Sequence, residues 1–107
     1  TSFTSSVKGG GDIETLDSNT KIYSDNFSGV TEIYQNNIIW ASQLSIDVNS
    51  FYVESGNFRL VVLQNDEIIH DFVIGEDKTL VLDDVKGDIS IRMAGESANF
   101  QFYIRVY

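Results

Sequence analysis

The sequence contains no cysteine, no proline and only one histidine. Without cysteine the chain has no disulfide, no thiol nucleophile and no thiolate-bound metal. Without proline, no cis-prolyl bond can slow its folding. Long hydrophobic runs are also missing: none approaches the roughly 20 apolar residues that a membrane-spanning helix needs. We therefore expect no transmembrane segment.

Basic residues are scarce as well. Seven lysines and arginines stand against 16 aspartates and glutamates, which gives a net charge of −9. Nucleic-acid binding needs cations that neutralise phosphates, and anionic membrane surfaces attract basic segments for the same reason. The composition therefore argues against nucleic acid as a partner and disfavours anionic membranes. Its direct physical effect is to keep copies of the chain apart in solution.

What the sequence has in quantity is alternation of apolar and polar residues. Apolar side chains recur at every second position in residues 58–62, 68–74 and 100–106, and turn signals such as Asn65-Asp66 and Gly75 follow these runs or separate them. A period of two places one face of each run against a core and the other in water. A succession of such short runs predicts an antiparallel β-sheet.

The first half of the chain is patterned less clearly. Residues 43–53 alternate, with an interruption at Asn49-Ser50 where we expect a bulge. Residues 30–35 are rich in strand formers, although a single helical turn is the alternative. Residues 1–11 have the Ser, Thr and Gly content of a flexible tether. The remaining residues, 12–107, are then one domain.

These patterns predict an all-β fold of about eight strands without a helix. Short antiparallel strands with one apolar face bury it most easily as two stacked sheets, so we expect a jelly-roll-like β-sandwich. A closed barrel is the second choice.

Residues 79–107 show an order of strands and glycines that occurs elsewhere. An apolar run at 79–82 leads to Gly87, an alternating run ends before Gly95, and a last alternating run starts at Phe100. This order resembles the closing half of small extracytoplasmic bacterial β-sandwich modules, such as pre-peptidase C-terminal-like domains, although Ile89 stands where those domains have an aromatic residue. It is also similar to domains of uncharacterised Gram-positive lipoproteins. The resemblance implies an exported, cell-surface or secreted module without catalytic residues, and a signal or lipid anchor upstream of residue 1 is the matching hypothesis.

Catalytic and metal chemistry have weak sequence support. His70 and Asp71 are neighbours in an alternating run, so their side chains point to opposite faces and do not form an acid–base pair. We interpret His70 as a partly buried or rim residue. Asp83, Asp84 and Asp88 carry the oxygen ligands that calcium prefers, but the D-x-[DN]-x-[DN]-G loop is absent. We expect no cofactor, while calcium near Asp83–Asp88 stays an open hypothesis.

Aromatic side chains are the remaining candidates for ligand contact. Trp40 follows Ile38-Ile39, which favours a core position over an exposed platform. On the last run, the side chains between the apolar ones share the outer face. An aromatic and arginine stripe there is either a contact surface or an ordinary hydrated face with cross-strand pairs. The candidate ligand-binding residues are Trp40, Tyr103, Arg105 and Tyr107.

The sequence therefore predicts a non-catalytic, extracytoplasmic accessory or interaction module whose partner is a protein or a glycan. A carbohydrate-binding module is the alternative, and its mark is an exposed Trp40 or a pair of exposed tyrosines. A hydrolase built around His70 is the second alternative. The sequence leaves the oligomeric state open.

Overall fold

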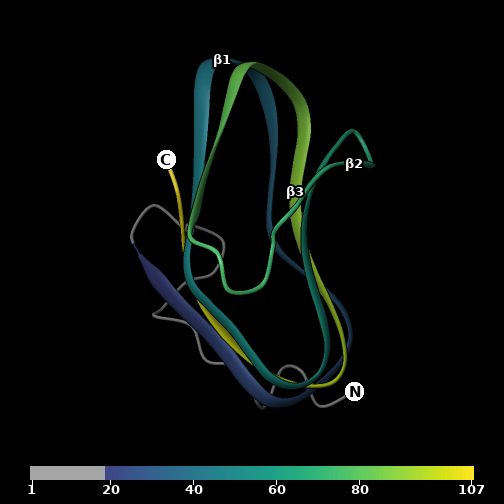
Figure 1. Ribbon diagram of the computed structural model, residues 1–107. Coiled ribbons are helices and arrows are strands. Elements are labelled where there is room, and N and C mark those ends of the chain that lie inside the picture. The colour runs from purple at the N-terminus through teal and green to yellow at the C-terminus, as the bar shows by residue number, and fades with distance from the viewer. Residues whose placement is uncertain (1–18) are drawn as a thin grey trace.

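The computed structural model describes residues 19–107, which form a single antiparallel sheet (Figure 1). Its strands are β1 (Thr20–Gln64), β2 (Glu67–Asp71) and β3 (Lys78–Val106), in the order β2-β1-β3. The predicted all-β class is confirmed. Residues 19–107 contain no helix, and hence none that is long and apolar enough to cross a membrane. The tether expected at residues 1–11 lies outside the described residues.

β1 and β3 pair along two registers. The first begins with Thr20 opposite Ile104 and ends with Val48 opposite Lys78. The second begins with Ile46 opposite Val106 and ends with Gln64 opposite Ile89. Residues 89–104 of β3 therefore have β1 on both sides. Figure 1 shows the result, in which the long strands curve round and run beside each other over their whole length.

Bends inside the strands replace most of the turns expected from the sequence. The interruption at Asn49-Ser50 is confirmed, because the register shifts there and Ser50 has a φ of 54°. Residues 83–87 and 95–99, which have the polar and glycine content of turns, both lie inside β3. Asp84 and Ser97 bend the chain there with φ values of 51° and 49°. The expected division into about eight strands in two sheets is therefore not confirmed.

Two expected turns do separate strands: Gly75 lies in a turn between β2 and β3, and Asn65-Asp66 lies between β1 and β2. Gln64 pairs with Glu67, and Asn65 and Asp66 between them have φ values of 51° and 66°. Positive φ at both central residues is the geometry of a tight two-residue hairpin, and Asn and Asp tolerate it. The Asn65 side chain adds a bond, because its Oδ1 accepts the N–H of Asp88 at 3.0 Å. The hairpin predicted at Asn65-Asp66 is confirmed.

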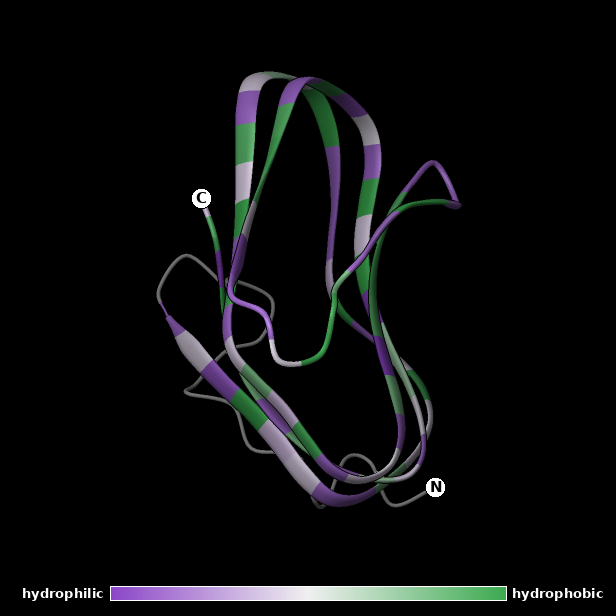
Figure 2. Cartoon of the chain, viewed as in Figure 1, coloured by the Kyte–Doolittle hydropathy of each residue, from purple (hydrophilic) through white to green (hydrophobic). Residues whose placement is uncertain are grey.

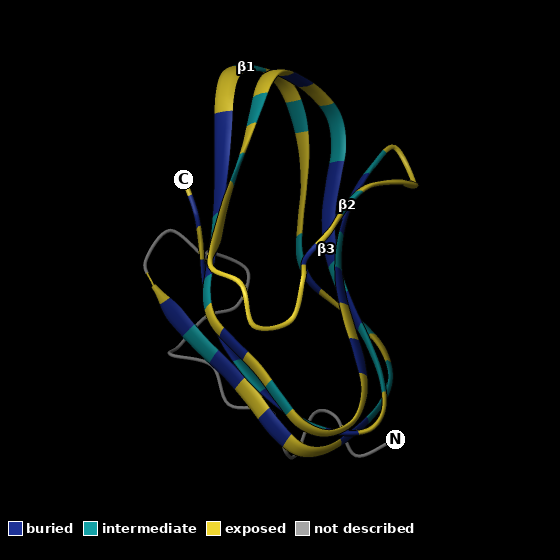
Figure 3. Cartoon of the chain, in the orientation of Figure 1, coloured by how far each residue is buried: buried dark blue, intermediate teal, exposed yellow. Residues whose placement is uncertain are grey.

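The core is the inward face of this curved sheet. Hydrophobic and hydrophilic bands alternate along β1 and β3 in Figure 2, and buried and exposed bands alternate in Figure 3. At its centre the rings of Phe58 and Phe100 stack, with centroids 4.0 Å apart. Phe27 meets Phe100 edge-on at 5.6 Å, and Phe51 meets Phe102 in the same way at 5.7 Å. Such contacts add to the free energy of burying the rings.

Gly56 and Gly75 provide a matched test of the bend at 55–57. Both have positive φ, 80° and 89°. A Cβ on Gly56 would lie 2.1 Å from the carbonyl oxygen of Ser97, whereas one on Gly75 would have nothing within 4 Å. We expect Gly75→Ala to lower the free energy of unfolding by about 1–2 kcal/mol through backbone strain alone. Gly56→Ala adds a backbone clash and should lower it by about 3 kcal/mol or more.

Urea denaturation of both variants measures this difference. Equal losses for the two alanine variants would contradict the close approach of Gly56 to Ser97.

Candidate functional site

Three of the polar residues singled out for catalysis and metal binding, His70, Asp71 and Asp88, are engaged in structural contacts. His70 is half-buried, as expected, and its ring meets Phe72 edge-on at 4.6 Å. Asp71 pairs with Arg59 at 2.7 Å. Asp88, from the calcium hypothesis, accepts a hydrogen bond from the side chain of Gln35. Within residues 19–107 no three His, Cys, Asp or Glu side chains gather where they could hold a metal ion.

Trp40 is exposed, so its interpretation as a core residue is wrong. Its side chain is 62% exposed and that of Ile39 is 90% exposed. The reason is local: Ile38 pairs with Gly87 and Ala41 pairs with Val85, so two residues of β1 lie opposite one residue of β3. Such a bulge breaks the alternation that would have turned Trp40 inward.

Tyr103 and Arg105 lie on the outward side of β3, as predicted, and Tyr107, which directly follows the strand, is exposed as well. The apolar residues that alternate with them, including Phe102 and Ile104, are buried. β1 adds more aromatic side chains to this side, because it flanks β3 on both edges. We call this surface the tyrosine face and define it by Lys21, Tyr23, Asn49, Tyr52, Gln101, Tyr103, Arg105 and Tyr107.

The centre of the tyrosine face is a row across three neighbouring segments. Tyr23 pairs with Gln101 on one side, and Tyr52 pairs with Gln101 on the other. In the next row Lys21 and Asn49 flank Tyr103 in the same manner. Tyr23 and Tyr52 are both exposed. The face therefore presents two phenol rings on either side of an amide that can both donate and accept hydrogen bonds.

Cations lie over two of the tyrosines. The Lys21 ammonium is 5.2 Å from the ring centroid of Tyr23, and the Arg105 guanidinium is 4.1 Å from that of Tyr107. A cation over a ring face is attracted by the ring's quadrupole, and the flat guanidinium also stacks on it. Asp47 lies opposite Arg105 in the ladder and accepts a hydrogen bond from Thr79 at 3.0 Å.

The ligand-binding residues chosen from the sequence did not include Tyr23, Tyr52 or Lys21. Tyr23 alternates with the buried Ile22 and Ser24, so its outward position was readable from the pattern. Tyr52 follows the bulge at Ser50, where alternation no longer fixes the side. Tyr23 and Tyr52 lie beside Gln101 of β3 only because segments far apart in the sequence pair with each other.

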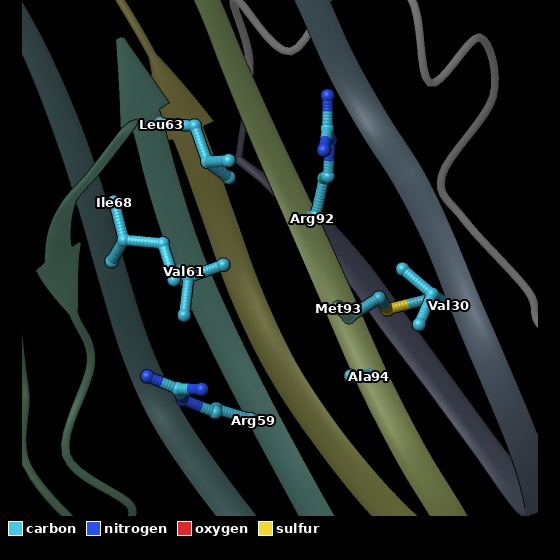
Figure 4. A pocket seen from close by; sticks show the side chains of 8 residues that line it. All are labelled: Val30, Arg59, Val61, Leu63, Ile68, Arg92, Met93 and Ala94. Carbon is cyan, nitrogen blue, oxygen red and sulfur yellow. The ribbon is translucent and has the colours of Figure 1, made fainter. Parts of the chain in front are cut away.

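A separate hollow of about 200 Å³ lies where β1 meets β2 and β3 (Figure 4). Its walls are mainly apolar, with an arginine from each of two strands. Arg59 pairs with Asp71, and Arg92 lies 3.5 Å from both Glu32 and Asp66. Its arginines are thus neutralised by the protein's own acids. The lining residues are Val30, Arg59, Val61, Leu63, Ile68, Arg92, Met93 and Ala94.

Comparison with known proteins does not assign the chain. No family model matches the sequence, and no curated protein matches it. The function has to be argued from the surfaces described above.

The exposure of Trp40 is directly measurable, because it is the only tryptophan in the chain. We expect the emission maximum of the folded protein to be that of a hydrated indole, with efficient quenching by acrylamide. Unfolding in urea should move the maximum very little. A blue-shifted maximum that moves to the red on unfolding would return Trp40 to the core.

Proposed function

We propose that the protein is a non-catalytic binding module and that the tyrosine face binds an extended, uncharged polysaccharide. The observation that carries the proposal is the row in which Tyr23 and Tyr52 flank Gln101. Adjacent strands lie about 4.8 Å apart, so the two tyrosines are ~10 Å apart across the sheet. Their rings offer flat apolar surface to the C–H faces of sugars, and the amides of Gln101 and Asn49 suit sugar hydroxyls.

The charge of the protein favours a neutral ligand. A net charge of −9 repels polyanions before they make contact. On the tyrosine face itself, Lys21 and Arg105 lie over rings, with Asp47 opposite Arg105. With Asp47 counted, the face holds two cations and one acid, which is too small an excess of charge to make an ionic ligand its main choice.

The geometry gives the hydrolase alternative no support. Glycoside hydrolysis uses two carboxyl groups on either side of the bond to be cut. Among the ladder partners of Gln101, Tyr103 and Arg105 the one carboxylate is Asp47, and it accepts a hydrogen bond from Thr79. His70 lies on β2 opposite Val62, with its ring against that of Phe72, and it is not part of this face. Binding without turnover is therefore the proposal, and an extracytoplasmic accessory role follows from the resemblance of residues 79–107 to exported modules.

We also propose a finer architecture, in which bends divide the strands into about eight segments that form the two layers of a jelly-roll-like sandwich. Its support is a contact between segments that are not ladder partners. Phe58 pairs with Gly95, and Phe100 pairs with Ser24 and Val53, yet the rings of Phe58 and Phe100 stack. One layer would contain 20–24, 99–106, 43–49 and 78–83, and the other 28–37, 88–96, 57–64 and 67–71.

Energetic coupling between Phe58 and Phe100 tests the two layers. We expect a double-mutant cycle of Phe58→Leu and Phe100→Leu to give a coupling of about 0.5–1.5 kcal/mol in the free energy of unfolding, because each change removes the same ring contact. The control cycle combines Phe58→Leu with Phe72→Leu, since the Phe72 ring lies against His70. Additivity in the first cycle would contradict stacking between the layers.

Binding to neutral polysaccharides tests the proposed function. We expect glycan-array hits among uncharged chains, and we expect Tyr23→Ala and Tyr52→Ala each to weaken the affinity by about tenfold or more, as truncation of a central aromatic contact does. Both side chains are exposed, so the variants should keep the stability of the parent protein.

Trp40→Ala is the matched control. It removes another exposed aromatic side chain, but from the bend at 38–41 and not from the tyrosine face. Unchanged affinity in this variant supports the tyrosine face. A loss of affinity confined to Trp40→Ala, or the absence of any glycan ligand, would overturn the proposal.

A further inference from the structure

β2 has one free edge among the described residues. It is the outer strand of the order β2-β1-β3, and its ladder runs only to β1, from Val61 opposite Asp71 to Gln64 opposite Glu67. Figure 1 shows β2 and its hairpin projecting beside the long strands. Main-chain N–H and C=O groups on such an edge are open to pairing with another strand.

Exposed apolar side chains accompany this edge. Ile68 and Val73 are each more than half exposed, and Ile69 and Ile74 are exposed as well. We call residues 67–74 the β2 edge. Ile68 also forms part of the wall of the hollow in Figure 4, next to Val61 and Leu63. A strand added at the β2 edge would thus find apolar contacts as well as main-chain partners.

Acidic residues flank the apolar ones, and they argue against a second copy as the occupant. Antiparallel pairing of β2 with itself would bring the Glu67 ends of two copies onto the same short ladder. Asp71 adds little to this repulsion, because it is paired with Arg59 and the register shift at Ile69 turns it to the other face of β2 from Glu67. Parallel pairing would stack identical acids. Like charges directly opposite each other destabilise a strand pair. Two further acids, Glu76 and Asp77, follow the edge, and Glu67 has no cation within ion-pair distance in residues 19–107.

We propose that the β2 edge binds an extended segment of a different protein, which adds to the sheet as an antiparallel strand. Apolar residues would recur at every second position of this segment, and a lysine or arginine at its end would meet Glu67. Asp71 is already paired with Arg59. Main-chain bonds provide the affinity in this mode of recognition, and side chains provide the choice of partner. The surface shares no residue with the tyrosine face, so the inference stands independently of glycan binding.

The probe is the peptide acetyl-Lys-Val-Thr-Val-Thr-Val-Lys-amide, titrated into the full chain by NMR. One control peptide has glutamate in place of lysine at both ends. The other keeps the side chains of the lysine peptide but has alternate backbone nitrogens methylated. We expect the lysine peptide to bind and to slow amide exchange in residues 67–71. The glutamate peptide should bind at least tenfold more weakly, and the methylated peptide should not bind, because it cannot form the ladder.

Glu67→Lys gives a test that misfolding cannot imitate. The variant should bind the lysine peptide more weakly by fivefold or more and bind the glutamate peptide more tightly than the parent does. Equal binding of the methylated peptide would mean nonspecific apolar contact and would overturn the proposal, as would no binding of the lysine peptide. A dimer that Ile69→Lys abolishes would instead make a second copy the occupant and overturn it as well.

Discussion

Hydrogen bonding of β3 on both of its sides by β1 is the constraint on which the rest of the structure depends. Residues 89–104 are held in two registers at once, so a slip of one residue would break both ladders and turn the phenylalanines outward. The stacked rings of Phe58 and Phe100 oppose such a slip from the inside. The same alternation sends Gln101, Tyr103 and Arg105 to the outside. The register of these two ladders therefore decides both which side chains form the core and which form the tyrosine face.

Long strands must bend to enclose a core of this size, and the sequence provides the bends without ending the ladders. Single residues with positive φ, such as Ser50, Asp84 and Ser97, change the direction of the chain while pairing resumes beyond them. Small and polar side chains suit these positions, because they tolerate left-handed backbone at low energetic cost. At Gly56 the approach to Ser97 leaves no room for a Cβ. Bends and turns thus use the same residue types.

Because bends and turns use the same residue types, only part of the fold could be predicted from the sequence. Alternation placed Tyr103, Arg105 and Tyr107 correctly, since side-chain direction in an unbroken strand depends only on parity. Trp40 was misplaced because the bulge at 38–41 breaks parity, and no residue type there announces it. The division into about eight strands is not confirmed, because Asp83-Asp84 and Gly95 signal a bend inside a strand and a turn between strands equally well. The pairing of Tyr23 and Tyr52 with Gln101 depends on contacts between distant segments, which a local pattern does not contain.

The two proposed surfaces differ in the chemistry that each leaves available. On the tyrosine face the main chain is already paired on both sides of β3, so only side chains remain to select a ligand. At the β2 edge the main chain is open on one side. The acidic side chains around this edge favour a partner strand that carries positive charge. A strand added beyond β2 would extend the sheet away from β3 and would not change the ladders that hold the tyrosines. Because neither ligand needs a group that the other uses, both surfaces can be occupied in the same molecule.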